Sequence, residues 1–333
     1  MGRLSAVDLD AVAIGPSAHM RAVFDAIPVV SAGDSPVLIV GEPGTGKELV
    51  ARVVHQSSHR RRAPFVAVSC AGLSEPALTA DLFGHERGGV PGATRPRAGR
   101  FERAQGGTLF LDDVDQAPPG VQARLTRVLQ DRQCERLGAT QAIALDLRII
   151  AASRCRLRPL VAAGRFSDDL LQRLDVIALD LPPLRERRED VPVLLRHFVE
   201  RATRRRGLPP PVIPPHVEHA FLRYTWPGNV RELENVCERL AQTCVCGTVR
   251  TGCIPPSVLF DRPGGDDAPT PAFEPPRAVS LDDRLREVEG QLIAWALRAA
   301  DGNKSRAAEL LHIKRTTLAD RINRHGRPAS RVC

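Results

Sequence analysis

Lysine is almost absent from this chain of 333 residues. Only Lys47, Lys304 and Lys314 are lysines among the 47 basic residues, so the other 44 are arginines. The chain evidently uses arginine wherever a general cation suffices. A compact ammonium differs from the planar guanidinium in charge distribution and hydrogen-bonding geometry. We therefore expect Lys47, the one lysine before residue 304, to lie where a compact positive charge is required.

Further absences limit the class of protein. No apolar run approaches the roughly 20 residues that a transmembrane helix needs, and no secretory leader pattern is visible. The eight cysteines lack the spacing of a secreted disulfide framework, so we expect reduced thiols in a cytoplasmic protein that does not contact membranes. The length and the 43% hydrophobic content are enough for two or three domains with packed cores.

The stretch around Lys47 has the pattern of a phosphate-binding loop. An apolar run at 37–40 precedes a Gly-rich turn, and a helical pattern begins at Leu49. In such a loop, backbone N–H groups and a helix N-terminus face the phosphates, and the lysine reaches the outer ones. The alternative is a Gly-rich turn without a ligand. We predict ATP-phosphate binding by Gly41, Glu42, Pro43, Gly44, Thr45, Gly46, Lys47 and Glu48.

Residues 106–113 form a second motif, an apolar strand that ends in two carboxylates. Asp112 follows Lys47 by 65 residues, as a Walker B acid follows a phosphate loop. We predict that Asp112 holds Mg²⁺ through its water shell and that Asp113 is the catalytic acid that orients the attacking water. The alternative is a strand that ends in a solvated turn.

Strand and helix patterns alternate up to about residue 185, and only helical patterns follow. This alternation predicts an α/β fold over residues 12–185, with a parallel sheet covered by helices on both faces. Residues 186–258 have the pattern of a helical subdomain. Residues 259–280 are rich in Pro and Gly and are predicted to be a flexible linker, and residues 281–326 form an all-helical domain.

Three local expectations accompany this division. Arg60, Arg61 and Arg62 should form a solvent-exposed turn. Residues 64–68 should form a second buried strand. Residues 84–100 are rich in Gly, Pro and Arg and should form an exposed loop.

Four cysteines cluster in the helical region, at Cys237, Cys244, Cys246 and Cys253. Thiolates so close together can bind a metal or respond to oxidants. Paired C-x-x-C spacing is absent, however, and some of these residues have apolar neighbours on a helix face. We therefore expect ordinary packing rather than a metal or redox site.

The C-terminal segment is basic, since residues 301–333 hold eight Lys and Arg against three acidic residues. Helical patterns at 305–311 and 315–324 predict a helix-turn-helix whose second helix reads the DNA major groove. The helix predicted at 281–298 would pair two subunits on a palindromic double-stranded site. A hairpin used only for dimerisation is the alternative. The predicted base contacts are Lys314, Arg315, Thr316, Thr317 and Arg321, and the predicted phosphate contacts are Lys304, Arg306 and Arg324.

With these motifs in this order, residues 12–326 resemble the bacterial sigma-54-dependent transcription activators, which join a AAA+ P-loop domain with a helical lid to a Fis-type helix-turn-helix domain. The resemblance implies a hexameric ring ATPase that remodels sigma-54 RNA polymerase from a distant DNA site. It also implies that Arg231 is the sensor II arginine of the lid. The motifs that carry it are the phosphate loop with Glu48 in place of Ser or Thr, and residues 82–86, 106–113, 182–187 and 226–233.

The chain departs from this family at positions that serve hydrolysis. Asp113 replaces a Glu, and its side chain is shorter by roughly 1.5 Å, whereas a misplacement of ~1 Å can cost about a hundredfold in rate. Ser69 replaces the Asn that partners this acid, and Arg154 replaces the sensor I Asn. Two arginines normally reach the neighbouring subunit's nucleotide. The first is Ser167 here, and the second matches Arg173, a predicted catalytic residue.

The surface loop that contacts sigma-54 in this family departs as well. The family sequence is Gly-Ala-Phe-Thr-Gly-Ala, and this chain has Gly-Gly-Val-Pro-Gly-Ala at residues 88–93. Val90 replaces the aromatic residue, and Pro91 removes both a hydroxyl group and a backbone N–H. We expect the sigma-54 contact to be impaired.

The sequence thus predicts a transcription regulator that binds ATP and Mg²⁺ in a AAA+ core and binds DNA through its C-terminal helices, with impaired hydrolysis. Because no receiver domain is visible before the core, we do not expect phosphorelay input within the chain. Two alternatives remain open. One is an active ATPase that remodels sigma-54 polymerase, with Asp113 and Arg173 sufficient for catalysis. The other is a partner subunit in a mixed ring with an intact relative, in place of a homo-oligomer.

Overall fold

The computed structural model describes residues 15–244, 247–259, 289–290, 293, 296–297, 300, 303–311 and 313–325. The chain divides into two compact units, Met1–Pro263 and Gly264–Cys333. The predicted linker lies outside the described residues, apart from residue 259. Within the described part, no helix combines the length and apolar character needed to cross a bilayer.

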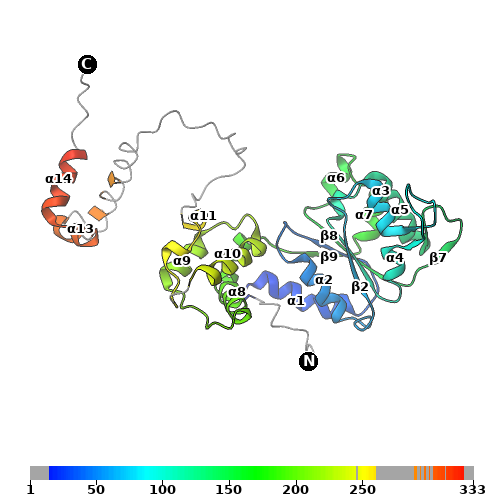
Figure 1. The fold of residues 1–333 in the computed structure, drawn as a ribbon, viewed down its shortest axis with the longest axis horizontal. Coiled ribbons are helices and arrows are strands. Elements are labelled where there is room, and N and C mark those ends of the chain that lie inside the picture. The colour runs from blue at the N-terminus through cyan, green and yellow to red at the C-terminus, as the bar shows by residue number, and fades with distance from the viewer. Residues whose placement is uncertain are drawn as a thin grey trace, which may run out of the picture. The chain divides into compact units, whose positions relative to one another are not determined.

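The first unit is built on a five-stranded parallel sheet with the strand order β2-β5-β8-β1-β9, shown in Figure 1. This architecture confirms the predicted α/β fold. Because these strands are parallel, the carboxyl ends of β1, β5 and β8 lie at one edge of the sheet. The strands are β1 Val37–Val40, β2 Phe65–Ser69, β5 Thr108–Asp112, β8 Arg148–Ser153 and β9 Ile177–Asp180.

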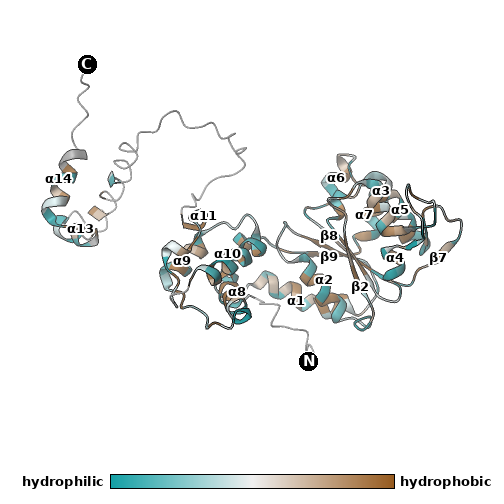
Figure 2. Ribbon diagram, viewed as in Figure 1, coloured by the Kyte–Doolittle hydropathy of each residue, from teal (hydrophilic) through white to brown (hydrophobic). Residues whose placement is uncertain are grey.

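Successive residues of the central strands face opposite sides of the sheet, which creates two hydrophobic cores. In β5, Leu109 and Leu111 pack in one core and Phe110 packs in the other. Helices α1 (Ala18–Ser31) and α2 (Lys47–Gln56) cover the side of Phe110. Figure 2 shows hydrophobic colour along the buried strands and mixed colour on the covering helices. The opposite side is covered by α3 Glu75–Phe83, α4 Arg100–Arg103, α5 Pro119–Asp131, α6 Arg158–Ala162 and α7 Asp168–Leu174.

The sheet differs from the predicted one at its edges. Strand β2 is an edge strand in which only Val68 is buried, so the prediction of a buried strand at 64–68 was wrong for the other positions. Strand β9 forms the other edge and was not predicted. Two antiparallel ribbons were not predicted either. They pair β3 (Gly84–His85) with β4 (Arg97–Ala98), and β6 (Gln133–Glu135) with β7 (Ala142–Ala144).

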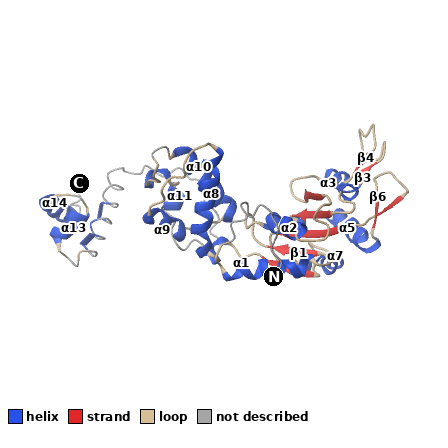
Figure 3. Cartoon of the chain, turned by 90° about the horizontal axis from the view of Figure 1, so that it is seen from below, coloured by secondary structure: helices blue, strands red, loops and turns tan. Residues whose placement is uncertain are grey.

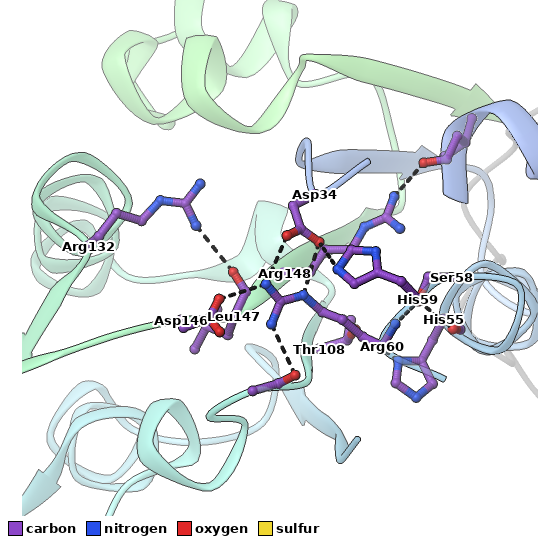
Figure 4. Close-up of polar contacts among 12 residues, drawn as sticks. Asp34, His55, Ser58, His59, Arg60, Thr108, Arg132, Asp146, Leu147 and Arg148 are labelled. Atoms are coloured by element: carbon purple, nitrogen blue, oxygen red, sulfur yellow. Dashed lines mark hydrogen bonds and ion pairs between the residues drawn. The ribbon is translucent and has the colours of Figure 1, made fainter. Parts of the chain in front are cut away.

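Arg60 lies in the predicted turn, but the expectation that its side chain is solvated was wrong. Its side chain is only 10% exposed and binds Asp34 at 2.9 and 2.8 Å and Asp146 at 2.6 Å, as Figure 4 shows. It also donates to the Gly106 carbonyl at 3.0 Å. These hydrogen bonds lower the pKa of Asp34. Arg60 thus joins three segments that precede β1, β5 and β8, whereas its neighbour Arg61 is exposed as predicted.

A helical subdomain follows the sheet, and Figure 3 shows its helices as a group that contains no strand of the sheet. Its core surrounds Trp226, which is fully buried and donates its indole N–H to the Phe221 carbonyl at 2.9 Å. Cys237 packs in the same core, and burial raises the pKa of its thiol well above the usual range. Ordinary packing is therefore confirmed for Cys237, whereas Cys246 lies outside the described residues. The helices are α8 Val191–Arg205, α9 Pro215–Arg223, α10 Asn229–Thr243 and α11 Pro256–Leu259.

The helical subdomain contacts the loop between β1 and α2 through the first turn of α10. The backbone N–H groups of Val230 and Arg231 donate to the Gly44 carbonyl at 2.9 and 3.3 Å. Gly44 has φ +81°, and a Cβ atom at this position would lie 2.3 Å from the Gly228 carbonyl oxygen. Only glycine combines this backbone conformation with so close an approach.

This contact between the loop and α10 forms a buried seam, and the fully buried Asn229 stabilises it. Its side-chain N–H groups donate to the Pro43 carbonyl and to the Glu42 carboxylate, both at 3.1 Å. Its side-chain oxygen accepts the Leu184 N–H at 2.7 Å. Arg187 adds a buried hydrogen bond to the Thr45 carbonyl at 2.9 Å. The loop is therefore held by backbone and side-chain groups of the residues that flank α10 and precede α8.

The second unit contains the predicted pair of short helices, α13 (Lys304–Leu310) and α14 (Arg315–His325). The Asn303 side chain caps α13 by accepting the N–H groups of Ser305 and Arg306 at 3.0 and 3.3 Å. Leu318 and four alanines form a small core with Ile293. Of the helix predicted at 281–298, residues 289–290, 293 and 296–297 are described, and all five are helical.

The seam at Gly44 leads to a prediction about local stability. The change Gly44→Ala forces a side chain into the left-handed region, at a cost of roughly 1–2 kcal/mol, and against Gly228. We expect faster amide hydrogen exchange at the start of α10, by about tenfold or more, without any ligand. Gly33→Ala is the matched control, because a Cβ atom added at Gly33 would have no neighbouring atom within 4 Å. Unchanged exchange at Val230 and Arg231 in Gly44→Ala would contradict this account.

Candidate functional site

The carboxyl ends of β1, β5 and β8 and the first turn of α10 enclose a cavity of about 320 Å³. It brings together residues that are far apart in sequence, as expected at this edge of a parallel sheet. Of the predicted nucleotide-binding residues, Gly41, Glu42 and Thr45 are outside its lining. The lining residues are Pro43, Gly44, Gly46, Lys47, Glu48, Leu49, Asp112, Asp113, Arg154 and Arg231.

Lys47 is held inside the loop that precedes α2. Its ammonium group donates to the carbonyls of Gly41 and Glu42 at 2.7 and 3.2 Å, and only 7% of the residue is exposed. Burial lowers the pKa of Lys47. Thr45 closes the loop by donating its hydroxyl to the Glu42 carbonyl at 2.9 Å. The ammonium group of Lys47 therefore lies at the end of the turn. Charged oxygens of a ligand would be stronger hydrogen-bond acceptors for it than these two carbonyls.

The Glu42 side chain serves the loop rather than the cavity. Its carboxylate accepts two hydrogen bonds from Arg185, at 2.8 and 2.6 Å, besides the one from Asn229. The Arg185 bonds are the main reason that the pKa of Glu42 is lowered. The Glu42–Arg185 pair links the loop to residues 182–187, one of the motifs of the family resemblance. The sequence analysis did not predict that Arg185 pairs with Glu42.

The two acids at the end of β5 have different environments. Asp112 is half-buried, and desolvation together with the neighbouring charge of Asp113 raises its pKa. Asp113 has φ +52° and forms a two-bond ion pair with Arg154, from Nε at 2.9 Å and from Nη2 at 2.7 Å. Hydrogen bonding to Arg154 lowers the pKa of Asp113. Asp113, the acid predicted to orient water, is therefore already bound to the Arg154 guanidinium.

Asp115 is a structural support of this ion pair that the sequence analysis missed. Its carboxylate accepts the backbone N–H of Arg154 at 3.0 Å and the hydroxyl of Ser153 at 3.3 Å. Asp115 is 8% exposed. The third acid of Asp112-Asp113-Val114-Asp115 was the available signal, but nothing in that pattern indicates a partner at the end of β8.

The donor set of the cavity suits a hard divalent cation. Asp112 offers a carboxylate beside the phosphate loop, and Glu48 offers a second one in the first turn of α2. Mg²⁺ is generally held by one or two carboxylates together with water and phosphate oxygens. Glu48 also pairs with Arg52 at 2.6 Å on the same helix. Asp112 is therefore the principal candidate ligand.

The predicted catalytic residue Arg173 and the two departures from the family at Ser69 and Ser167 do not line this cavity. The Ser69 hydroxyl accepts the Ala71 N–H at 3.2 Å, and Ser167 caps α7 by accepting the Leu170 N–H. Arg173 lies at the end of α7 and donates to the Gln130 side chain at 2.9 Å. Ser69 and Ser167 thus have local structural roles, and the role of Arg173 toward a neighbouring subunit stays a prediction.

A second cavity of about 400 Å³ adjoins the first. Both cavities are lined by Gly44, Gly46, Glu48, Leu49 and Arg231. Apolar side chains of Leu49, Phe198 and Val230 line it between α2, α8 and α10. Arg201 lies over the Phe198 ring at 5.0 Å and pairs with Glu234. The surface beside the polar cavity is thus partly apolar and includes a ring.

The loop that corresponds to the sigma-54-contacting loop of the family, residues 88–93, ends in a tight turn. The Val90 carbonyl accepts the Ala93 N–H at 3.0 Å, and the Ala93 carbonyl accepts the Gly88 N–H at 2.9 Å. Pro91 precedes Gly92, which has φ +82°. Proline followed by a residue with positive φ is the signature of a type II turn. The turn therefore fixes the tip of this loop.

Most of the predicted DNA-contacting residues in the second unit are accessible. The exceptions are Thr317, which is half-buried, and Arg321, which is exposed but paired with Glu289 at 2.7 Å. Arg324 lies in α14, but its side chain is outside the described part of the chain. The exposed candidates are Lys304, Arg306, Lys314, Arg315 and Thr316.

Comparisons with known families divide the chain into three consecutive regions. Residues 13–180 match the sigma-54 interaction domain. Residues 185–270 match the AAA+ ATPase lid domain. Residues 284–325 match the Fis family of bacterial regulatory proteins.

Two relatives are similar over more than nine tenths of the chain. The transcriptional regulatory protein ZraR of Klebsiella oxytoca is 42% identical over 315 residues, which cover 93% of this chain and 68% of ZraR. The DNA-binding transcriptional regulator NtrC of Klebsiella pneumoniae is 43% identical over 329 residues, which cover 94% of this chain and 70% of NtrC.

A solved structure is similar over the same length. NtrX from Brucella abortus in complex with ADP has a TM-score of 0.69 and 31% identity, over 94% of this chain and 69% of that one. Its complex with ATP has a TM-score of 0.68. Three family models match successive regions, and relatives above 40% identity match over more than nine tenths of the chain. The chain therefore belongs to the family of sigma-54-dependent transcription activators, with a AAA+ core, a AAA+ lid and a Fis-type helix-turn-helix domain.

Proposed function

We propose that this protein is a cytoplasmic transcription regulator that binds ATP with Mg²⁺ and a specific DNA site, but hydrolyses ATP slowly and contacts sigma-54 poorly. The Arg154–Asp113 ion pair carries the proposal, because it lies in a cavity that keeps Lys47, Asp112 and Arg231. The binding groups of the family are present, and the acid needed for hydrolysis is bound to another residue.

Nucleotide binding is supported by the position of Lys47 at the end of the loop and by the ADP and ATP complexes of the NtrX relative. In this proposal the loop and Arg231 hold the phosphates, and Asp112 holds Mg²⁺ through water. The partly apolar cavity beside Phe198 would accept the base. Bound Mg²⁺ would supply charge neutralisation at the outer phosphates.

Slow hydrolysis follows from two properties of Asp113. Its carboxylate is shorter than the Glu of the family, and both of its oxygens accept hydrogen bonds from Arg154. A carboxylate engaged in this way is a weaker partner for water, because its lone pairs and its charge are already partly satisfied. Ser69 is shorter than the Asn of the family, and its hydroxyl oxygen accepts the Ala71 N–H at 3.2 Å.

The impaired contact with sigma-54 is supported by the chemistry of the loop tip. Val90 offers less contact area than an aromatic residue, and Pro91 has no donor. The tip forms a hydrogen-bonded turn through Gly92, and the ring of Pro91 fixes its own φ. RNA polymerase remains the partner of the family, and we propose that this chain acts on it weakly or indirectly.

DNA binding and assembly complete the proposal. The exposed Lys314, Arg315 and Thr316 lie at the start of α14, where a recognition helix meets base edges. Lys304 and Arg306 at the start of α13 would meet phosphates. We propose a dimer on a palindromic site, with the AAA+ cores assembling into a homo-oligomeric ring or joining an intact relative through Arg173.

The first prediction of this proposal concerns turnover. The full chain should bind ATP yet hydrolyse it more slowly than about 1 s⁻¹, an ordinary lower value for enzymes, in a steady-state phosphate-release assay with and without DNA. Lys47→Ala should abolish nucleotide binding. The combination of Asp113→Glu, Arg154→Asn and Ser167→Arg should raise the rate by at least about tenfold. Wild-type turnover at or above about 1 s⁻¹ would refute impaired hydrolysis.

The second prediction concerns DNA. Arg315→Ala should relax sequence preference and cost about 1–3 kcal/mol on the preferred site, whereas Lys304→Ala should weaken all sequences alike and reduce the salt slope by about one. Arg61→Ala, at an exposed arginine of the first unit, is the control. If a chain ending at residue 263 protects the same site in a footprint, the DNA-binding element has been misassigned.

A further inference from the structure

Arg187 is a buried cation that reaches the phosphate loop from the segment before α8. Only 5% of the residue is exposed, and its Nη2 donates to the Thr45 carbonyl at 2.9 Å. Its Nε has no hydrogen-bond partner among the described residues. Burying a guanidinium is costly, and an apolar side chain of similar volume often packs in its place without loss of stability. The buried charge therefore indicates that Arg187 serves the loop rather than the packing of the core.

The hydrogen bond at the Thr45 carbonyl fixes the direction of the next backbone N–H group. The peptide between Thr45 and Gly46 is trans, so its C=O and N–H groups lie in one plane and point in opposite directions. Because the carbonyl faces Arg187, the Gly46 N–H points away from Arg187. Gly46 lines both cavities, whereas Arg187 lines neither. No described residue accepts the Gly46 N–H, so this donor is available to a ligand oxygen.

Asp190 supports Arg187 and is itself docked on the start of α1. Only 1% of Asp190 is exposed, and its two carboxylate oxygens accept the N–H and the hydroxyl of Ser17, both at 2.8 Å. The remaining charge of this carboxylate lies 3.9 Å from Nη1 of Arg187 and attracts it. The backbone before α1 lies so close that a Cβ atom added at Gly15 would be 1.9 Å from Oδ1 of Asp190.

We propose that Arg187 is a positioning residue for the Gly46 N–H, which it directs toward a phosphate of the nucleotide, and that Asp190, docked on Ser17, holds Arg187 in place. The inference rests on the proposed nucleotide binding. Backbone N–H groups of a phosphate loop contact the inner phosphates, which ADP and ATP share. Both nucleotides therefore depend on Arg187, although Arg187 does not contact either of them.

The first test measures the equilibrium affinities of the full chain for ADP and for a non-hydrolysable β,γ-imido analogue of ATP. Arg187→Met keeps the length of the side chain but removes its donors, so both affinities should fall by about tenfold or more. Arg187→Lys keeps a donor and should recover part of this loss. Arg196→Met is the matched control, because Arg196 is 59% exposed, pairs with Glu218 and lines neither cavity. It should change neither affinity.

A spectroscopic readout separates the direction of the N–H from a general loss of stability. In the wild type, the Gly46 amide proton should shift downfield in the NMR spectrum when ADP saturates the protein, because the N–H then donates to a charged oxygen. The shift should be much smaller in Arg187→Met at saturating ADP and should return in Arg187→Lys. Thermal unfolding without nucleotide checks that each variant is folded.

Gly15→Ala tests the part played by Asp190 without altering a charged residue. The added Cβ atom displaces the Asp190 carboxylate, so ADP affinity should fall by about threefold or more. The fall should be much smaller in the Arg187→Met background, because both changes act through the same hydrogen bond to Thr45. Gly33→Ala is the control, since a Cβ atom added there has no neighbour within 4 Å.

The outcomes distinguish this inference from the proposed function. Unchanged ADP affinity or an undiminished Gly46 shift in Arg187→Met overturns the inference and leaves nucleotide binding intact. If Arg187→Met does not fold, an undiminished shift in Gly15→Ala overturns it instead. Equal losses from Gly15→Ala in both backgrounds overturn the role of Asp190. A wild-type chain that binds neither nucleotide overturns the inference and the proposed nucleotide binding together.

Discussion

The contact between Gly44 and the first turn of α10 joins the two halves of the nucleotide-binding core. Two N–H groups of a helix that begins at Asn229 meet one carbonyl of the loop, and the Asn229 amide bridges the loop to Leu184. The N-terminal N–H groups of a helix have no partner within it, so the loop satisfies donors that would otherwise be buried and unpaired. This contact also places Arg231 at the cavity. The shape of the site thus depends on a hydrogen-bonded seam and on a glycine.

Near this seam, the residues proposed to bind the nucleotide have a different environment from the acid proposed to support hydrolysis. Lys47 and Asp112 line the cavity, while Asp113 is paired with Arg154. In the proposed function, this pocket favours occupancy by ATP over turnover. Such a protein can use ATP as a structural ligand, because a ligand that binds only the folded or assembled state stabilises that state by mass action.

The sequence predicted what local motifs encode. The phosphate loop, the acid-ended strand, the start of α10 and the pair of C-terminal helices each depend on neighbouring residues, and each lies where the pattern indicated. Contacts between distant segments were not predictable. Arg60 and Arg154 look alike in a chain with 44 arginines, and their partners are fixed only when the sheet brings strand ends together. The edge strands β2 and β9 were misjudged or missed because edge positions carry a weaker burial pattern.

Open-complex formation by sigma-54 polymerase tests the central claim most directly, at a promoter that carries the binding site of this protein. The account predicts that the full wild-type chain with ATP does not open the promoter. It also predicts that Val90→Phe with Pro91→Thr restores at most weak sigma-54 binding unless Asp113→Glu, Arg154→Asn and Ser167→Arg are added. A relative with the intact loop sequence provides the positive control. Robust promoter opening by the unmodified protein would contradict the account and identify it as an active remodeller.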